Sequence, residues 1–195
     1  MTDFRDAVTL EGRHVRLEAL GPQHAAGILA AADSDDVFRW LTVRRPTTLG
    51  EAEALVERYV SDPTLVAWAQ IDATTGEVAG ATSYYDVVPE QCTVAIGFTW
   101  LGQRHWRTGI NTEAKLLLLT RAFEDLGCVR VVWHTDELNE RSRNAITRLG
   151  ATFEGLQRKQ KRRLDGSWRT TATFSMTDDD WPDVRGRLSE RLTRA

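Results

Sequence analysis

The sequence is poor in cysteine, and its histidines do not cluster. Only two of its 195 residues are cysteines, Cys92 and Cys128, which are too few for a disulfide framework and lack the spacing of a zinc site. We expect both to be free thiols that pack as small hydrophobic residues. No metal is predicted, because the four histidines are scattered along the chain: His14, His24, His105 and His134.

The sequence also lacks a strong charge imbalance and a long hydrophobic run. It holds 25 Lys and Arg against 28 Asp and Glu, so the formal net charge of −3 gives no global attraction to nucleic acid or to an anionic membrane. No apolar stretch approaches the roughly 18 residues of a membrane-spanning helix. The polar N-terminus, MTDFRDAVTLEG, does not resemble a secretory signal. We therefore expect a cytoplasmic protein that does not bind membranes.

The composition is that of a globular protein, with 42% hydrophobic and 27% charged residues. A chain of this length can bury one sizeable core without disulfide or metal crosslinks. We find no internal repeat, low-complexity tract or linker composition. The sequence therefore predicts a single domain over residues 1–195, and dimerisation is a common default for such a chain.

Hydrophobic periodicity predicts an α+β fold with a mixed central sheet. Three consecutive strands in the first half favour antiparallel order, and the following strand–helix–strand unit predicts one parallel crossover at the sheet centre. Thr48 is a predicted N-cap, and Asp165-Gly166 a hairpin turn. The predicted strands are 9–20, 65–72, 77–87, 92–101, 128–135, 151–164 and 167–176. The predicted helices are 22–32, 35–41, 49–60, 110–126, 140–149 and 178–194.

The most informative segment is WLGQRHWRTGINTEAK, from Trp100 to Lys115. A strand ends, a glycine-containing basic loop turns, and a helix begins whose first amides have no intrahelical partner and suit a phosphate group. Gly109 allows close approach of a ligand to the backbone. Four further residues offer charge or polar contacts: Arg104, Arg107, Asn111 and Thr112. The segment predicts a site for a diphosphate-bearing cofactor, although a capped helix after a basic turn has the same pattern.

A second segment, NERSRNAITRLG, begins the helix after the parallel strand. Asn139 occupies an N-cap position, and Ser142 lies one turn further on. Both segments follow carboxyl ends of neighbouring parallel strands, where ligands bind in such sheets. Asn139 is therefore either a ligand contact or a helix cap alone.

Together the two segments resemble the GNAT (Gcn5-related N-acetyltransferase) superfamily, and more narrowly its RimJ/RimL-like branch. The resemblance rests on WRTGINTEA, on NERS, and on the opening LEG…VRL, and it covers roughly Thr9 to Met176. It implies an acetyl-CoA-dependent N-acetyltransferase in which two central strands splay apart around the cofactor. The pantetheine would pair with four strand residues: Phe98, Thr99, Trp100 and Leu101. The pyrophosphate would lie on the backbone of six more: Arg107, Thr108, Gly109, Ile110, Asn111 and Thr112.

The resemblance also implies roles for two residues of the second segment. At three other positions the sequence departs from the family pattern. Asn139 would touch the cofactor, and Ser142 would approach its sulfur. Trp106 stands where relatives often carry Gln or Arg, and Asn111 stands where they often carry Gly or Ala. Because backbone amides would bind the cofactor, we expect neither departure to abolish cofactor binding. Ile146 replaces a tyrosine that many relatives use as an acid, and Ser142 inherits that role by default.

The reaction implied is direct attack of a neutral amine on the thioester. A backbone amide near Phe98 or Thr99 would stabilise the developing oxyanion. The general base stays open: His134 is a candidate, with Asp86 and Glu137 as alternatives. Any of the three could equally have a surface or capping role.

The acceptor is expected to be a protein N-terminus or a small amine, recognised through residues 37–46. The alternative is a non-catalytic CoA-sensing or RNA-binding module on the same fold. The basic run QRKQKRR, at 157–163, could contact an acidic substrate or RNA, but a solvated strand face is the preferred interpretation. We expect nucleic-acid binding to be absent, because the tryptophans do not interleave with basic residues.

Overall fold

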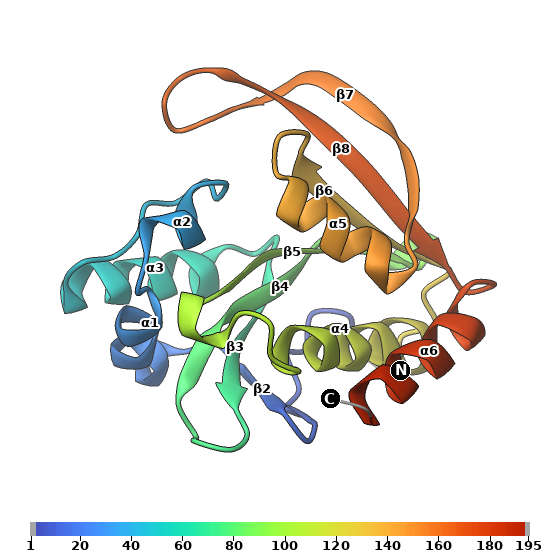
Figure 1. The fold of residues 1–195 in the computed structure, drawn as a ribbon, viewed down its shortest axis with the longest axis horizontal. Helices are drawn as coiled ribbons and strands as arrows, with labels where there is room; N and C mark the ends of the chain where they lie inside the picture. Colours follow the sequence, from blue (N-terminus) through green and yellow to red (C-terminus); the bar gives the residue numbers. More distant parts are fainter. Residues whose placement is uncertain (1–2, 194–195) are drawn as a thin grey trace.

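The strands form one mixed sheet in the order β1-β2-β3-β4-β5-β6-β8-β7 (Figure 1). The computed structural model describes residues 3–193. Every neighbouring pair is antiparallel except β5 and β6, which are parallel. The predicted α+β fold with one parallel crossover is therefore confirmed. The strands are β1 (Leu10–Glu11), β2 (Val15–Ala19), β3 (Val66–Asp72), β4 (Val78–Val88), β5 (Thr93–Leu101), β6 (Arg130–Asp136), β7 (Thr152–Arg162) and β8 (Trp168–Thr177).

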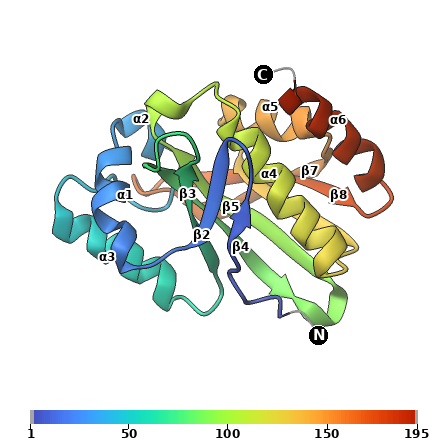
Figure 2. The ribbon, with the colours of Figure 1, turned by 90° about the horizontal axis from the view of Figure 1, so that it is seen from below.

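Helices cover both faces of the sheet, with α1 and α3 on one side and α4 and α6 on the other (Figures 1 and 2). The β7–β8 hairpin arches over α5 at the far edge (Figure 1). The helices are α1 (Ala25–Ala31), α2 (Asp35–Phe38), α3 (Leu49–Ser61), α4 (Ile110–Thr120), α5 (Glu140–Leu149) and α6 (Trp181–Thr193). The other helical segments are three short 3-10 turns, at Pro22–His24, Pro89–Gln91 and Gln103–His105, and a π turn at Arg121–Asp125.

Alternating side chains of the central strands divide the interior into two cores. Val66 and Trp68 of β3 point into the core that α4, α5 and α6 close, whereas Ala67 and Ala69 point into the core of α1, α2 and α3. Successive residues of a strand face opposite sides of a sheet, so a strand covered on both faces is apolar throughout. The result is a three-layer arrangement with the sheet in the middle.

The predicted first strand, 9–20, is wrong in one respect. It breaks at Gly12 and folds back, so that β1 and β2 pair with each other. The buried carboxylate of Glu113, in the first turn of α4, accepts the backbone amides of Arg13 and Val15 at 2.9 Å and also that of His14. A Cβ at Gly12 would come within 2.5 Å of that carboxyl group. The turn is therefore set by a contact 100 residues away along the chain.

Other boundaries differ from the predicted ones by a few residues. The predicted helix 22–32 opens with a 3-10 turn, and α2 is shorter than predicted because it ends at Phe38. The predicted helix 110–126 is α-helical to Thr120 and then widens into a π turn at Arg121–Asp125. The predicted end of the last helix, Arg194, lies outside the described residues.

The predicted N-cap at Thr48 and the predicted hairpin turn at Asp165-Gly166 are confirmed. Thr48 caps α3, with Glu51 completing a capping box. Gly150 ends α5 with a φ of 102°, and Gly166 adopts a φ of 84° in the turn between β7 and β8. Glycine has no Cβ, so it adopts these conformations without strain. These local signals therefore fix the ends of elements whose pairing is long-range.

Replacing Glu113 with Ala should lower the free energy of unfolding by about 2–4 kcal/mol, because several buried amides lose their acceptor together. For a chain of this size the melting temperature should fall by roughly 2–4 °C per kcal/mol. Glu53→Ala, an exposed site on α3, is the matched control and should change stability by less than about 0.5 kcal/mol. Equal melting temperatures for the two variants would contradict this account.

Candidate functional site

The central feature of the site is an opening between the two parallel strands. β5 and β6 pair only at Thr93–Ala95 with Arg130–Val132. Beyond that point β5 stays with β4 as far as Leu101, while β6 follows β8 as far as Asp136. The two strands therefore splay apart, and beyond this point each has one edge to which no strand of residues 3–193 pairs.

The splay continues into a cleft of about 940 Å³. Eleven of the residues predicted from the sequence line it: Phe98, Thr99, Trp100, Leu101, Arg107, Thr108, Asn111, Thr112, His134, Asn139 and Ser142. They come from β5, the loop after it, α4, β6 and α5. Three predicted residues do not line the cleft: Arg104, Gly109 and Ile110. The fold thus brings most of the predicted set to one place.

The three outlying residues have other surroundings. Arg104 turns toward Glu77, 3.8 Å away, and its Nε lies 3.2 Å from the His105 ring. Ile110 is buried in the core. A Cβ at Gly109 would come within 2.8 Å of the His14 ring. Gly109 is therefore needed for packing against the β1–β2 turn, and its role in the approach of a ligand stays a prediction.

A β-bulge distorts β5 at the mouth of the cleft. Between the pairs Ser83–Gly97 and Ala81–Trp100, β5 contains one residue more than β4, and Phe98 has a φ of 50°. Such a bulge leaves a residue outside the ladder and changes the direction of its backbone groups. The bulge lies at Phe98 and Thr99, the predicted donors to an oxyanion.

The loop before α4 is held rigidly below the cleft. The Thr108 hydroxyl donates to the His105 carbonyl at 2.8 Å and lies 3.4 Å from the amide of Ile110. The first backbone bond of the helix runs from the Glu113 amide to the Gly109 carbonyl. The amides of Asn111 and Thr112 precede it, so they have no intrahelical acceptor and face the end of the helix dipole that favours anions.

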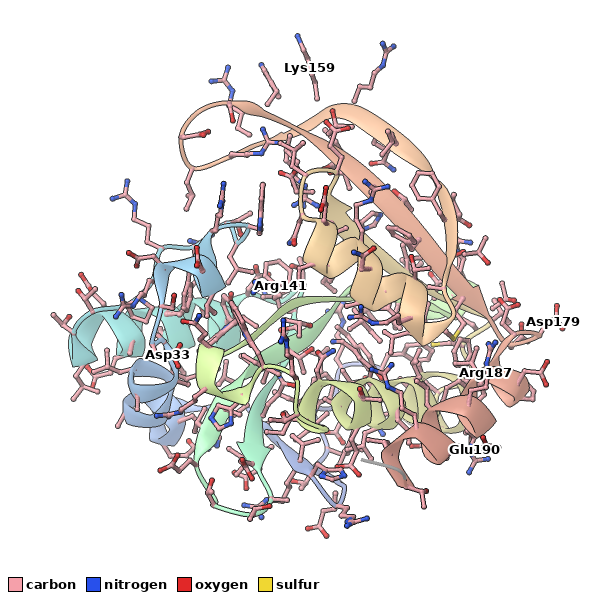
Figure 3. The ribbon with its side chains drawn as sticks, in the orientation of Figure 1. Asp33, Arg141, Lys159, Asp179, Arg187 and Glu190 are labelled. Atoms are coloured by element: carbon pink, nitrogen blue, oxygen red, sulfur yellow. The ribbon has the colours of Figure 1, made fainter. Side chains whose placement is uncertain are left out.

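Trp106 and Arg141 connect the two sides of the cleft. The Trp106 indole donates to the Leu101 carbonyl at 2.9 Å, which fixes the ring on the β5 side. The Arg141 guanidinium, from the start of α5, stacks 3.8 Å from the centre of that ring. Figure 3 shows Arg141 near the middle of the molecule, between α2 and α5. The departure at Trp106 thus gives the cleft a cation–π contact.

Asn139 is the N-cap of α5. Its Oδ1 accepts the amide of Ser142 at 3.1 Å, and both side chains line the cleft. The cap uses Oδ1, so Nδ2 is the atom with which Asn139 can contact a ligand. Ile146, which stands in place of the tyrosine of many relatives, is buried in the core and lines the same wall.

His134 makes a polar pair with a residue that the sequence did not indicate. Its Nδ1 lies 2.8 Å from the Tyr85 hydroxyl, and both side chains line the cleft. Burial lowers the pKa of His134 below 6.5, so the ring is neutral at pH 7 and can accept a proton. Burial raises the pKa of Tyr85, so its hydroxyl stays protonated. The other two candidate bases, Asp86 and Glu137, do not line the cleft.

Lys115 is a second residue that the sequence did not indicate. It is 5% exposed, and its Nζ lies 2.8 Å from Thr99 Oγ1 and 3.2 Å from Thr82 Oγ1. No ion pair to Lys115 is found within residues 3–193. Burial without a counter-ion lowers its pKa from 10.5 to about 7. The cleft wall therefore contains an amine that loses its proton near neutral pH.

Neither a metal centre nor a membrane span is found in the described part of the chain. No group of three or more His, Cys, Asp or Glu could hold a metal ion, and no helix is long and apolar enough to cross a bilayer. Cys92 and Cys128 are free thiols, as expected; Cys128 is buried and Cys92 is partly exposed.

The buried amine of Lys115 predicts a pH-dependent stability. The unfolded chain keeps this proton up to about pH 10.5 and the folded chain releases it near pH 7, so stability should rise with pH between these values. Relative to Lys115→Met, the wild type should gain up to about 1.4 kcal/mol per pH unit from pH 7.5 to 9 in denaturant unfolding. Lys159→Met, at an exposed lysine, should keep the wild-type slope. Parallel slopes for wild type and Lys115→Met would show that Lys115 is not the group responsible.

Comparison with known proteins agrees with this geometry. The model of the acetyltransferase (GNAT) domain family matches residues 14–152. A GCN5-related N-acetyltransferase from Brucella melitensis is 31% identical, with a TM-score of 0.92 over 96% of this chain and 86% of the other. A protein from T. thermophilus, described provisionally as an acetyltransferase, is 37% identical, with a TM-score of 0.89 over 98% and 100%.

A curated relative points the same way. YoaA, an uncharacterized N-acetyltransferase of Bacillus subtilis, is 23% identical over 155 residues, which cover 77% of this chain and 86% of YoaA. These comparisons support an enzyme rather than the non-catalytic alternative. With the family model covering most of the chain and the splayed strands in place, the protein belongs to the GNAT family of acetyltransferases.

Proposed function

We propose that this acetyltransferase binds acetyl-CoA in the cleft between β5 and β6 and transfers the acetyl group to a primary amine. The proposal rests mainly on the early end of the β5–β6 pairing. The cleft that opens there is also lined by residues of the first turn of α4. GNAT domains use acetyl-CoA as a general property of the family. The thioester supplies an activated acyl group.

The residues around the cleft fit the parts of this cosubstrate. The edge of β5 beyond Ala95 has no β-strand neighbour on the cleft side, so its backbone can pair with the amides of a pantetheine arm as an added strand would. The start of α4 suits a diphosphate. Three arginines that line the cleft add positive charge for the phosphates. They are Arg107 of the loop before α4, Arg148 of α5 and Arg191 of α6.

The proposed acid–base roles belong to polar groups that line the cleft. His134, neutral at pH 7, is our candidate for the base that takes the proton of the attacking amine, with Tyr85 fixing its ring. A backbone amide at Phe98 or Thr99 is the candidate donor to the oxyanion. Ser142 remains our candidate for returning a proton to the thiolate, because Ile146 has no ionisable group.

The acceptor enters our proposal as a protein N-terminus or a small amine. The motif resemblance to the RimJ/RimL-like branch supports the first class. The ribosomal-protein-S5-alanine acetyltransferase of Vibrio fischeri is 19% identical to this chain and shares its fold. At this identity the comparison supports the fold and does not transfer the substrate. Val37, Trp40, Leu41 and Thr42 line one side of the cleft and are the candidate contacts for the acceptor.

The activity should be measured as release of free CoA thiol from acetyl-CoA, with a panel of N-terminal peptides and small amines. We expect saturable, amine-dependent release. Preference for peptides would place the protein with N-terminal acetyltransferases, and preference for small amines with metabolic or detoxifying enzymes. No amine-dependent release above the buffer rate across the panel would contradict the proposed function.

Asn139 allows capping to be separated from cofactor binding. Asn139→Asp keeps the capping oxygen, so its stability should stay within about 0.5 kcal/mol of the wild type. It replaces the Nδ2 donor with a negative charge, so the Kd for acetyl-CoA should rise about tenfold in calorimetry. Asn139→Ala should weaken binding similarly and also lose about 1 kcal/mol of stability. If Asn139→Asp binds acetyl-CoA as tightly as the wild type, Asn139 is a helix cap alone.

A further inference from the structure

The β7–β8 hairpin brings two cations to the cleft from the side opposite α4. The hairpin arches over α5 (Figure 1). Lys161 of β7 and Arg169 of β8 are direct partners in the antiparallel register, and both line the cleft. Residues directly opposite each other in an antiparallel pair project from the same face of the sheet. The two positive charges therefore lie side by side.

Unlike Arg163 and Arg130, Arg169 has no carboxylate within ion-pair distance among the described residues, and Asp136 acts on it only from further away. Arg163 pairs with Asp136 at 2.6 Å, and Arg130 with Glu154. For Arg169 the described residues provide neither an ion pair nor a hydrogen-bond acceptor, and its Nε is buried without a partner. Leaving a buried donor unpaired costs roughly 1–3 kcal/mol, and more when the group is charged. This cost points to a ligand that supplies the missing acceptor.

No acidic side chain of the cleft is available to fill that place. Among the described residues that line the cleft, Asp136 is the one carboxylate, and Arg163 already bonds both of its oxygens, at 2.6 and 3.0 Å. Like charges directly opposite each other on a sheet are destabilising. An anion between Lys161 and Arg169 would reduce that repulsion and could supply an acceptor for the half-buried Arg169 guanidinium.

The two cations lie near the proposed base rather than near the phosphate-binding helix. Arg169 interacts electrostatically with Asp136, Tyr85 and His134. The Tyr85 ring packs edge-on against Phe98 at 5.4 Å, and Phe98 packs against Tyr59 of α3 at 5.8 Å. This group of side chains therefore lies on the α3 face of the sheet, whereas Tyr84, the preceding residue, bonds to α4 on the other face. This face, opposite α4, is therefore our candidate place for the acceptor.

We propose that the amine acceptor carries an anionic group, a carboxylate or a phosphate, and that Arg169 and Lys161 bind this group while the amine faces the Tyr85–His134 pair. The proposal rests on the acetyltransferase function given above. The planar guanidinium of Arg169 can bind either anion through two hydrogen bonds at once, and Lys161 adds a point charge. The substrate class is therefore an amino acid, an aminoalkyl phosphate or a similar small anionic amine.

Matched pairs of acceptors test the proposal. Free amino acids are compared with their amides, and phosphoethanolamine with ethanolamine, in the CoA-release assay. For the wild type, the anionic member of at least one pair should have a KM at least about tenfold below that of its neutral analogue. Arg169→Gln should raise the KM for the anionic member by about tenfold to a hundredfold, with little change for the neutral member. Lys161→Gln, at a more exposed side chain, should have a smaller effect of the same kind.

Arg162→Gln is the matched control. Arg162 adjoins Lys161 but stacks on the exposed Trp168 at 4.7 Å and does not line the cleft, so its variant should behave as the wild type. Lys159, another cation of the hairpin, also points away from the molecule (Figure 3). Circular dichroism and the Kd for acetyl-CoA check that each variant is folded and that its cofactor site is unchanged.

Two results would overturn the proposal while leaving the acetyltransferase function intact. One is that wild type accepts the neutral members as well as the anionic ones. The other is that Arg169→Gln changes the KM for both members of a pair equally. Salt-sensitive binding of an RNA oligonucleotide that both Arg169→Gln and Arg162→Gln weaken, with no discrimination between acceptors, would also overturn it and favour a nucleic-acid surface.

If no amine gives turnover, the acetyltransferase proposal fails. The proposed anion site at Arg169 and Lys161 is then tested by ligand binding. Calorimetry with CoA present would then measure binding of the amino acids and of phosphoethanolamine. Binding to wild type that Arg169→Gln loses would support the anion site on its own. Absence of binding to wild type would overturn it.

Discussion

The site depends on one constraint, the end of the β5–β6 pairing after three residue pairs. A backbone edge without a partner is unfavourable when buried, because each amide and carbonyl needs a hydrogen bond. Here each strand remains bonded along its other edge, β5 to β4 and β6 to β8. The unsatisfied edge is therefore limited to the cleft, where water or a bound substrate can supply the bonds. Had β6 followed β5 to Leu101, the sheet would be continuous and no cleft would exist.

The floor of the cleft is held in place by contacts that do not touch a ligand. Glu113 fixes the β1–β2 turn through three backbone amides, and that turn places His14 against Gly109. The Asp33 carboxylate accepts the amide of Gln103 at 2.7 Å and so anchors the loop before α4 to the end of α1. The loop that precedes the proposed phosphate site at the start of α4 is thus preorganised from two sides, and binding need not order it.

The parts of the site that the sequence revealed are those with local signals. The loop from Gly102 to Gly109 and the cap at Asn139 each combine a strand end, a turn and a helix start within a few residues. The parallel crossover followed from element order alone, and the splay was implied by the family resemblance. The missed residues have no local signal: Tyr85 is one of two adjacent tyrosines in β4, and Lys115 resembles any solvent-facing helix lysine. Their role depends on contacts 49 and 33 residues away in the chain, with His134 and Thr82.

The charges of the cleft show why global composition was a poor guide to its ligands. The chain as a whole has a net charge of −3, yet seven Lys and Arg and one Asp line the cleft. Positive charge near α4 is expected of a protein that binds phosphates, but Arg169 and Lys161 lie on the other side, beside Tyr85 and His134. An acceptor anion there would approach a cosubstrate that is itself negatively charged, and repulsion over such a short distance is only weakly screened inside a protein. Lys161 and Arg169 have no ion pair among residues 3–193, so they would offset that repulsion. The excess positive charge of the cleft would then matter most when both ligands are bound together.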